Sequence, residues 1–252
     1  MNEFAAATRF ALLLVRPGML VMGTPYFGGA YAPAVMRAGL TMLLAFMLAP
    51  LVPAPADLTM GTLTFVVLRE MLIGTALAVG VRVLLSAADM AGQLLGFQIG
   101  LSYGSLVDPQ SGVRNGVLAS LYSNLVIILA LIGGAHHAVI RAMAASYAAL
   151  PIGLGHVDGA LVPATARLLG MVMVLGIRIA GPVVVVLLAT ELLLGFMARV
   201  APSFNVLVVG APARLVIGLV VAAATLATLP PLVARYGPIT LDLAVQTARA
   251  FR

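Results

Sequence analysis

Long apolar stretches with few polar interruptions dominate this chain, and three of them carry no charged residue. They cover residues 38–56, 115–140 and 215–234. Each contains or approaches the about 17–25 residues that a helix needs to cross a bilayer. The pattern predicts membrane-spanning helices in these three places.

Clusters of glycine and proline divide the chain between the apolar stretches. Pro50 should end the first helix near Ala49, and Pro230 should end the last one at Leu229, because proline cannot continue a helix. Other clusters mark brief loops: Gly23-Thr24-Pro25, Gly28-Gly29, Pro53-Ala54-Pro55, Gly133-Gly134, Pro151-Ile152-Gly153 and Gly237-Pro238. We therefore predict an all-α fold of polytopic, membrane-associated helical hairpins that forms a single membrane-embedded domain over residues 1–252.

Composition supports a membrane-embedded protein. Of the 252 residues, 62% are hydrophobic and 9% are charged, and the mean hydropathy is +1.14. Globular domains are usually about 45–50% apolar and about 25% charged. Only a bilayer or a large apolar partner surface solvates such a chain, which argues against a soluble enzyme. Cysteine is absent, so a disulfide framework and a thiolate metal site are both excluded.

The basic residues do not form a nucleic-acid footprint. All 14 of them are arginines, against 8 acidic residues, which gives a formal charge of +6. They lie singly among apolar runs, without a basic stripe or an aromatic-interleaved patch, so nucleic-acid binding is not expected. The loops at 23–33, 51–59 and 150–160 contain no basic residue, so membrane orientation does not follow from the positive-inside rule.

Several charged residues interrupt apolar stretches, and a lone arginine at a bilayer centre costs at least about 2.5 kcal/mol. Arg9 and Arg167 lie near segment ends, where either snorkelling to the interface or a buried partner accounts for them. Arg178 lies in mid-helix and should meet a partner subunit, water or a carboxylate. The expected internal ion pairs are Arg69 with Glu70 and Glu191 with Arg199, and Arg16 and Arg82 interrupt two further stretches.

Glycines recur every fourth residue in one segment, at Gly92, Gly96, Gly100 and Gly104. On a helix they form a bare stripe against which another backbone can pack closely, although loose membrane-helix composition would also produce them. The polar side chains of this segment need partners on other helices or water: Gln93, Gln98, Ser102 and Ser105. We predict a packing helix rather than a lipid-facing one.

Two breaks follow in the pattern. Asp108-Pro109-Gln110-Ser111-Gly112 is a polar, non-helical sequence that is either external or lines a passage. Arg199, Pro202 and Asn205 indicate a kinked or broken helix with a charge and an amide at the break, a feature typical of functional interfaces.

Two alternatives from other classes stay open. Gly100-Leu101-Ser102-Tyr103-Gly104 matches G-x-S-x-G, but a nucleophile elbow needs a strand before it, so only an intramembrane serine protease using Ser102 with His136 or His137 survives. The adjacent histidines cannot share a metal as an i, i+4 pair would. The second alternative is a secondary transporter with two similar halves, although the chain lacks a cluster of acidic residues for ion coupling. A weak internal repeat suggests it: Pro33, Arg37, Gly39 and Pro50 correspond to Pro212, Arg214, Gly218 and Pro230.

An ordered set of motifs runs through nearly the whole chain: Pro25, Pro33, Arg37, Pro50, Arg69-Glu70, Gly74, Gly80, Ala91-Gly92-Gln93, Gly96-Phe97-Gln98-Ile99-Gly100-Leu101-Ser102, Asp108-Pro109-Gln110-Ser111-Gly112, Arg199-Val200-Ala201-Pro202, Asn205, Gly210, Pro212 and Gly218. This set resembles the FliR family of flagellar biosynthetic proteins, whose injectisome counterparts are the SctT-like proteins. Ser203, Ala211 and Arg214 depart from the residues that the family usually has there.

The resemblance implies a non-enzymatic subunit of the flagellar type III protein export gate in the bacterial inner membrane, within the basal body. It would assemble with FliP-like and FliQ-like subunits beside an FlhB-like subunit, contact membrane lipid, pass unfolded export substrates, and need no cofactor or metal. An injectisome subunit of the same family is the alternative. Arg69, Glu70, Arg178, Glu191, Arg199, Pro202 and Asn205 would lie at subunit interfaces.

The resemblance also implies that one loop plugs the closed channel, with the glycine stripe packed beneath it. The residues of this loop are Tyr103, Gly104, Ser105, Leu106, Val107, Asp108, Pro109, Gln110, Ser111, Gly112, Val113, Arg114 and Asn115.

Overall fold

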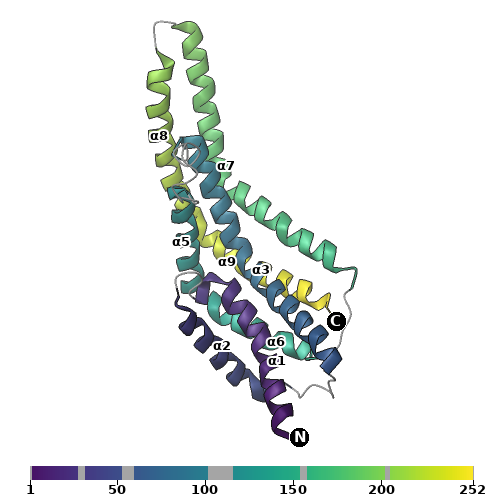
Figure 1. The fold of residues 1–252 in the computed structure, drawn as a ribbon. Coiled ribbons are helices and arrows are strands. Elements are labelled where there is room, and N and C mark those ends of the chain that lie inside the picture. Colours follow the sequence, from purple (N-terminus) through teal and green to yellow (C-terminus); the bar gives the residue numbers. More distant parts are fainter. Residues whose placement is uncertain are drawn as a thin grey trace. The chain divides into compact units, whose positions relative to one another are not determined.

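The structure, a computed structural model, describes residues 2–27, 32–52, 60–101, 116–153, 158–201 and 205–251. In these ranges it contains helices and no strand, so the all-α prediction is confirmed (Figure 1). The helices are α1 (Asn2–Gly23), α2 (Ala34–Leu48), α3 (Met60–Ile99), α5 (Val117–Ile132), α6 (Ala135–Ala149), α7 (Leu161–Val200), α8 (Val206–Thr225) and α9 (Leu229–Arg249), with single 3-10 turns η1 (Pro25–Phe27), η2 (Ala49–Leu51) and η4 (Leu226–Thr228).

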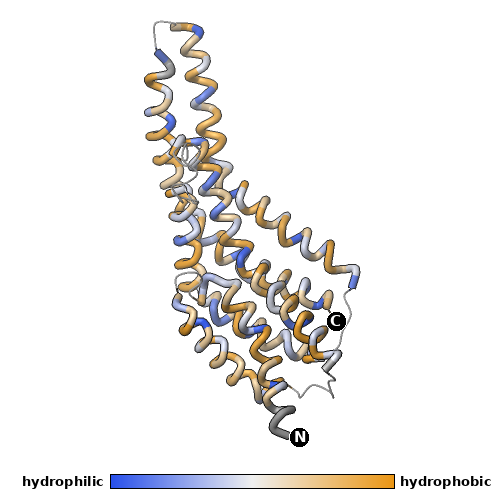
Figure 2. The backbone as a smooth tube through the Cα atoms, in the orientation of Figure 1, coloured by the Kyte–Doolittle hydropathy of each residue, from blue (hydrophilic) through white to orange (hydrophobic). Residues whose placement is uncertain are grey.

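Apolar helices long enough to cross a membrane confirm the polytopic prediction. Among the described residues, four candidate spans lie in Ala34–Leu51, Gly61–Ile99, Leu161–Val200 and Val208–Arg249. The pair α5 and α6 is bent by 70° at its break and makes a fifth candidate if it counts as one span. Gly134 has a φ of 73° at this break, a left-handed conformation that glycine adopts without strain. Figure 2 shows that apolar residues predominate along the helices.

Prolines behave differently from the prediction near the end of the chain. The helix expected to end at Leu229 already ends at Thr225, and α9 begins at Leu229 with Pro230 and Pro231 in its first turn. Proline suits the first turn because its missing N–H has no partner there in any helix. The predicted loop at Gly237-Pro238 is also wrong: Pro238 lies inside α9, where its side chain is exposed.

The chain divides into two compact units. Unit 1 comprises Met1–Val83, Ala130–Gly170 and Arg235–Arg252, and unit 2 comprises Leu84–Leu129 and Met171–Ala234. The prediction of a single domain over residues 1–252 stays a prediction. The core of unit 1 includes the fully buried Leu13, Ile73, Leu77, Met143 and Tyr147.

Close helix packing in both units depends on glycine. In unit 1 a β-carbon on Gly74 would lie 3.0 Å from the carbonyl oxygen of Arg16, so α1 and α3 touch backbone to backbone. In unit 2 a β-carbon on Gly92 would lie 2.6 Å from the backbone nitrogen of Ala119 in α5. The hydroxyl of Tyr122 ties α5 to the end of α8, 3.0 Å from the carbonyl oxygen of Ala222.

Candidate functional site

A buried charge cluster lies in the core of unit 1. Glu70 of α3 and Arg16 of α1 are both fully buried and form an ion pair. Two parallel hydrogen bonds join them: Arg16 Nε donates to Glu70 Oε2, and Arg16 Nη2 donates to Glu70 Oε1 at 2.9 Å. This bidentate geometry is the strong form of an arginine–carboxylate contact.

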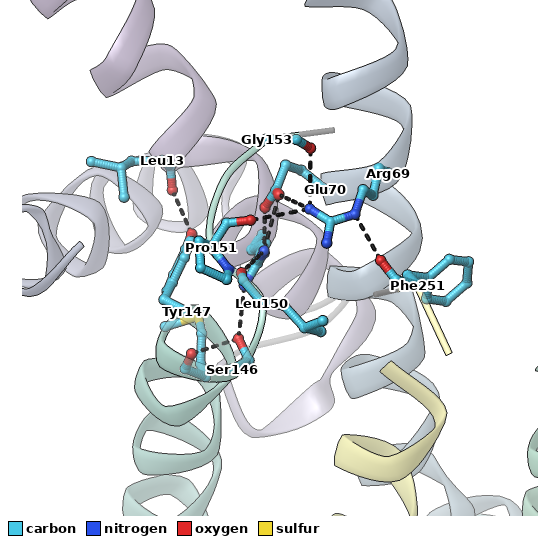
Figure 3. A network of polar contacts seen from close by, with 11 residues as sticks. Leu13, Arg69, Glu70, Ser146, Tyr147, Leu150, Pro151, Gly153 and Phe251 are labelled. Carbon is cyan, nitrogen blue, oxygen red and sulfur yellow. Dashed lines mark hydrogen bonds and ion pairs between the residues drawn. The ribbon is translucent and has the colours of Figure 1, made fainter. Parts of the chain in front are cut away.

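Arg16 also reaches α6. Its Nη1 donates to Ser146 Oγ at 3.2 Å, and its Nη2 donates to the carbonyl oxygen of Leu150 at 2.6 Å. The guanidinium carbon lies 4.3 Å from the ring centroid of Tyr147, whose hydroxyl donates to the carbonyl oxygen of Leu13. A charge buried away from water needs several such partners, and Figure 3 shows how these groups converge.

Arg69 forms the outer part of the cluster. Its Nη1 lies 3.6 Å from Glu70 Oε1, and its side chain is 12% exposed. Three carbonyl oxygens accept hydrogen bonds from it: Phe251 from Nε at 2.8 Å, Pro151 from Nη1 at 3.1 Å and Gly153 from Nη1 at 3.2 Å. One carboxylate and two arginines thus connect α1, α3, the turn after α6 and the end of the chain.

The sequence led to the Arg69–Glu70 contact but not to Arg16 as the main partner of Glu70. Both residues interrupt apolar runs, and a carboxylate and an arginine that are each isolated in apolar surroundings are expected to seek one another. That signal was present in the sequence. Their separation of 54 positions along the chain gave no register by which to choose between Arg16 and the other arginines.

Arg9 has a structural role rather than an interfacial one. Its Nη2 donates to the carbonyl oxygens of Ala49 at 3.0 Å and Val52 at 2.6 Å. These carbonyls follow the end of α2, where backbone acceptors have no partner within the helix. Arg9 therefore caps α2, which excludes snorkelling for this residue.

A second candidate site is the hairpin that α7 and α8 form in unit 2. We call residues 191–201 and 205–216 the hairpin end. Among its described side chains only Gly210 is buried. Its exposed side chains are mostly large and apolar: Leu192, Leu193, Phe196, Met197, Val200, Val208, Val209, Leu215 and Val216. A helix pair whose exposed surface is mostly apolar must be covered by lipid or protein.

The charged and polar residues of the hairpin end are few. Glu191 Oε1 lies 3.4 Å from Arg214 Nη1 across the hairpin, with both side chains 39% exposed, so the expected pair of Glu191 with Arg199 gives way to this one. Arg199 lies exposed in the last turn of α7. Asn205 caps α8, with its side chain accepting from the backbone nitrogen of Val208 at 3.4 Å. Arg178 is exposed in mid-helix.

The glycine stripe is only partly helical. Gly92 and Gly96 are buried in α3, but α3 ends at Ile99 and Gly100 has a φ of 98°. The backbone nitrogen of Gly100 donates to the carbonyl oxygen of Gly96, so Gly100 terminates the helix as glycine commonly does. Gly104, the predicted plug over 103–115, and the residues Ser102 and Pro202 lie outside the described residues.

The rings of the adjacent histidines His136 and His137 in α6 lie close together and are tilted with respect to each other. Their ring centroids are 4.0 Å apart, with an angle of 40° between the planes. Across the described ranges no group of three or more histidine, aspartate or glutamate side chains is placed to hold a metal ion.

Comparison with known proteins identifies a family of relatives. The family described as bacterial export proteins, family 1, matches residues 7–236. Three similar proteins are each named flagellar biosynthetic protein FliR. That of Pectobacterium carotovorum subsp. carotovorum is 30% identical over 227 residues, 89% of this chain and 86% of that protein. That of Caulobacter vibrioides is 29% identical over 87% of this chain and 90% of that protein. That of Escherichia coli is 29% identical over 86% of this chain and 84% of that protein.

Proposed function

Because this chain belongs to the family of bacterial export proteins, family 1, we propose that it is a non-enzymatic subunit of the flagellar type III protein export apparatus. It assembles with FliP-like and FliQ-like subunits, beside an FlhB-like subunit, into the inner-membrane channel through which unfolded substrates enter. The flagellar names of its relatives favour this role over an injectisome subunit. Family membership favours it over a secondary transporter and an intramembrane protease.

The observation that carries the assembly role is the exposed apolar surface along α7. The part of this helix that lies in unit 2, residues 171–200, has 30 residues, which corresponds to a length of about 45 Å. The hydrocarbon core of a bilayer is about 30 Å thick, so it covers about two thirds of that length. Exposed apolar side chains nevertheless occur from Met173, 57% exposed, to Val200, 67% exposed. The part of this surface that lipid does not reach needs a protein partner.

Charges on the same helix support protein contacts. Arg167 and Arg199 are both exposed, although apolar residues surround each of them. An arginine facing hydrocarbon costs at least about 2.5 kcal/mol, whereas a partner subunit can supply carbonyl or carboxylate acceptors. We therefore propose that Arg199 lies at a subunit contact, together with the broken connection between α7 and α8. Arg178 is assigned to such a contact by the family resemblance alone.

The test is co-purification from membranes in which the chain is expressed with the FliP-like and FliQ-like subunits. Leu193 and Phe196 of the hairpin end are each 66% exposed, so Leu193→Glu and Phe196→Glu should leave the core of the chain intact. A carboxylate buried without a partner at an interface should lower recovery of the complex at least about tenfold. Gln246→Glu, on an exposed position of α9, is the matched control and should recover the complex fully.

The amount of each variant in the membrane fraction separates assembly from insertion. If both hairpin variants reach the membrane at the level of the unmodified chain and still recover the complex fully, lipid rather than protein covers the hairpin end, and the assembly proposal fails.

The proposed plug rests on the family resemblance and on the place where α3 stops. Gly100 ends α3 immediately before the segment 103–115, so this segment starts where the packed helix finishes. We propose that it closes the channel in the resting apparatus.

A further inference from the structure

The last helix, α9, has two faces of opposite character. Thr240, Ala244, Thr247 and Ala248 are at most 3% exposed and form its inner face. The closeness of this contact is shown by Gly80 of α3, where a β-carbon would lie 3.0 Å from the backbone oxygen of Thr240. From Arg235 onward, four of the six exposed positions of α9 are polar.

Four exposed polar residues follow one another on the outer face at helical spacing: Arg235, Asp242, Gln246 and Arg249. We call them the α9 polar face. The intervals of seven, four and three positions place them on one side of the helix. In the fully described stretch from Arg235 to Arg249, Ile239 is the one large apolar side chain that is exposed, at 39%. This face carries charges of both signs.

Hydropathy alone assigns this region to a membrane. The candidate span Val208–Arg249 has 42 residues and includes both α8 and α9. Three charged residues and an amide on an exposed face cannot lie against lipid tails, where each would lack a partner. The outer surface of α2, in the same unit, is the opposite case, because its large exposed side chains are apolar: Val35, Met36, Met42, Leu43, Phe46 and Met47.

The residues next to the end of α9 extend its polar character. The backbone nitrogen of Asp158 donates to the carbonyl oxygen of Ala250 at 2.7 Å, which places the exposed Asp158 beside the end of α9. Arg69 holds the carbonyl oxygen of Phe251, and the Phe251 side chain is 4% exposed. The end of α9 is thus fixed, with its polar face turned outward and continued by an exposed acidic turn.

We propose that the α9 polar face borders bulk water in the assembled protein, so that α9 runs outside the hydrocarbon core and the crossing within Val208–Arg249 is confined to α8. Unit 1 then separates two media. Its α2 surface, which belongs to the candidate span Ala34–Leu51, contacts lipid tails, and its α9 surface contacts water.

The absence of cysteine makes single-cysteine labelling a direct test. Asp242→Cys and Gln246→Cys probe the α9 polar face, and Met47→Cys, at a position 62% exposed, is the matched control on α2. Each full-length variant is expressed with its native partners. Membranes are opened by sonication so that a membrane-impermeant maleimide reaches both sides, and labelling after denaturation gives the total thiol.

The two α9 cysteines should react at least about tenfold faster than the α2 cysteine, because thiolate formation and the reagent both require water. Equal amounts of each variant in the membrane fraction show that folding is unaffected. Labelling of Gln246→Cys and Asp242→Cys only after denaturation would overturn the proposal, since lipid or a partner subunit would then cover the face. Equal rates at Met47→Cys and Gln246→Cys would overturn the separation of two media.

Discussion

Arg16 and Glu70 lie 54 positions apart in the chain and form a bidentate ion pair with no exposed side-chain surface on either partner. This contact joins two helices in the buried core of unit 1, where water cannot replace a lost partner.

Removing one partner of the buried pair should destabilise the chain strongly. Arg16→Met leaves the Glu70 carboxylate without its two main donors, and Glu70→Leu leaves the two arginines without their carboxylate. We expect either change to lower the free energy of unfolding by about 3–5 kcal/mol. The double variant should lose less stability than the two single variants added together, because it removes both charges. Unfolding in detergent, followed by protease resistance, measures these differences, and additive losses would contradict the coupling.

The ion pair between Glu191 and Arg214 should behave differently. Both side chains are 39% exposed, so solvent screens their attraction. In the isolated chain Arg214→Leu should change stability by no more than about 1 kcal/mol. In the assembled complex the same change should reduce recovery of partner subunits, because partner contacts exclude water there. Comparing thermal unfolding of the isolated chain with co-purification separates the two effects, and a large loss in the isolated chain would contradict the screening.

Two glycine-to-alanine substitutions should change the stability of the chain in opposite directions. The β-carbon of Gly92→Ala would lie 2.6 Å from the backbone nitrogen of Ala119 and 2.7 Å from the backbone oxygen of Leu118, so α3 and α5 must separate. We expect about 1–3 kcal/mol of destabilisation. At Gly195 in α7 no atom lies within 4 Å, so Gly195→Ala should raise stability by up to about 1 kcal/mol. Thermal unfolding of both variants checks this, and equal effects would refute the close packing at Gly92.

Deleting residues 107–112 should open the resting channel. If the segment 103–115 plugs the passage, its removal should raise the conductance for small ions of membranes that contain the complete export complex. The purified complex must contain all partner subunits in unmodified amounts, which excludes a defect in assembly. Unchanged conductance in such complexes would show that another element closes the channel.

Local patterns in the sequence predicted the class of the fold and most of its breaks. The glycine pair at Gly133 and Gly134 marks the break between α5 and α6, and Pro50 follows α2 closely. Predictions from proline were wrong where the position of the residue within a helix, and not its presence, decides whether the helix ends. Pro230 and Pro231 stand in the first turn of α9, and Pro238 is accommodated inside α9 because burial of Thr240 and Ala244 favours the helix.

Contacts between distant segments could not be predicted in the same way. The charge of Glu70 required a partner, but the choice of Arg16 depends on how α1 crosses α3, which Gly74 permits. Glu191 likewise pairs across a hairpin with Arg214 instead of along its own helix. The requirement for neutralisation is a local property, whereas the identity of the partner is a property of the packing.

The hydrogen bond from Arg69 to the carbonyl oxygen of Phe251 has a consequence for the order in which unit 1 folds during synthesis. During synthesis the charges of Arg16, Arg69 and Glu70 emerge from the ribosome long before Leu150 and Phe251, which supply their remaining acceptors. Arg69 therefore gains its last acceptor only after Phe251 has been made, and the close of unit 1 is delayed until then. A truncation that removes Phe251 thus damages a core that begins at the first helix.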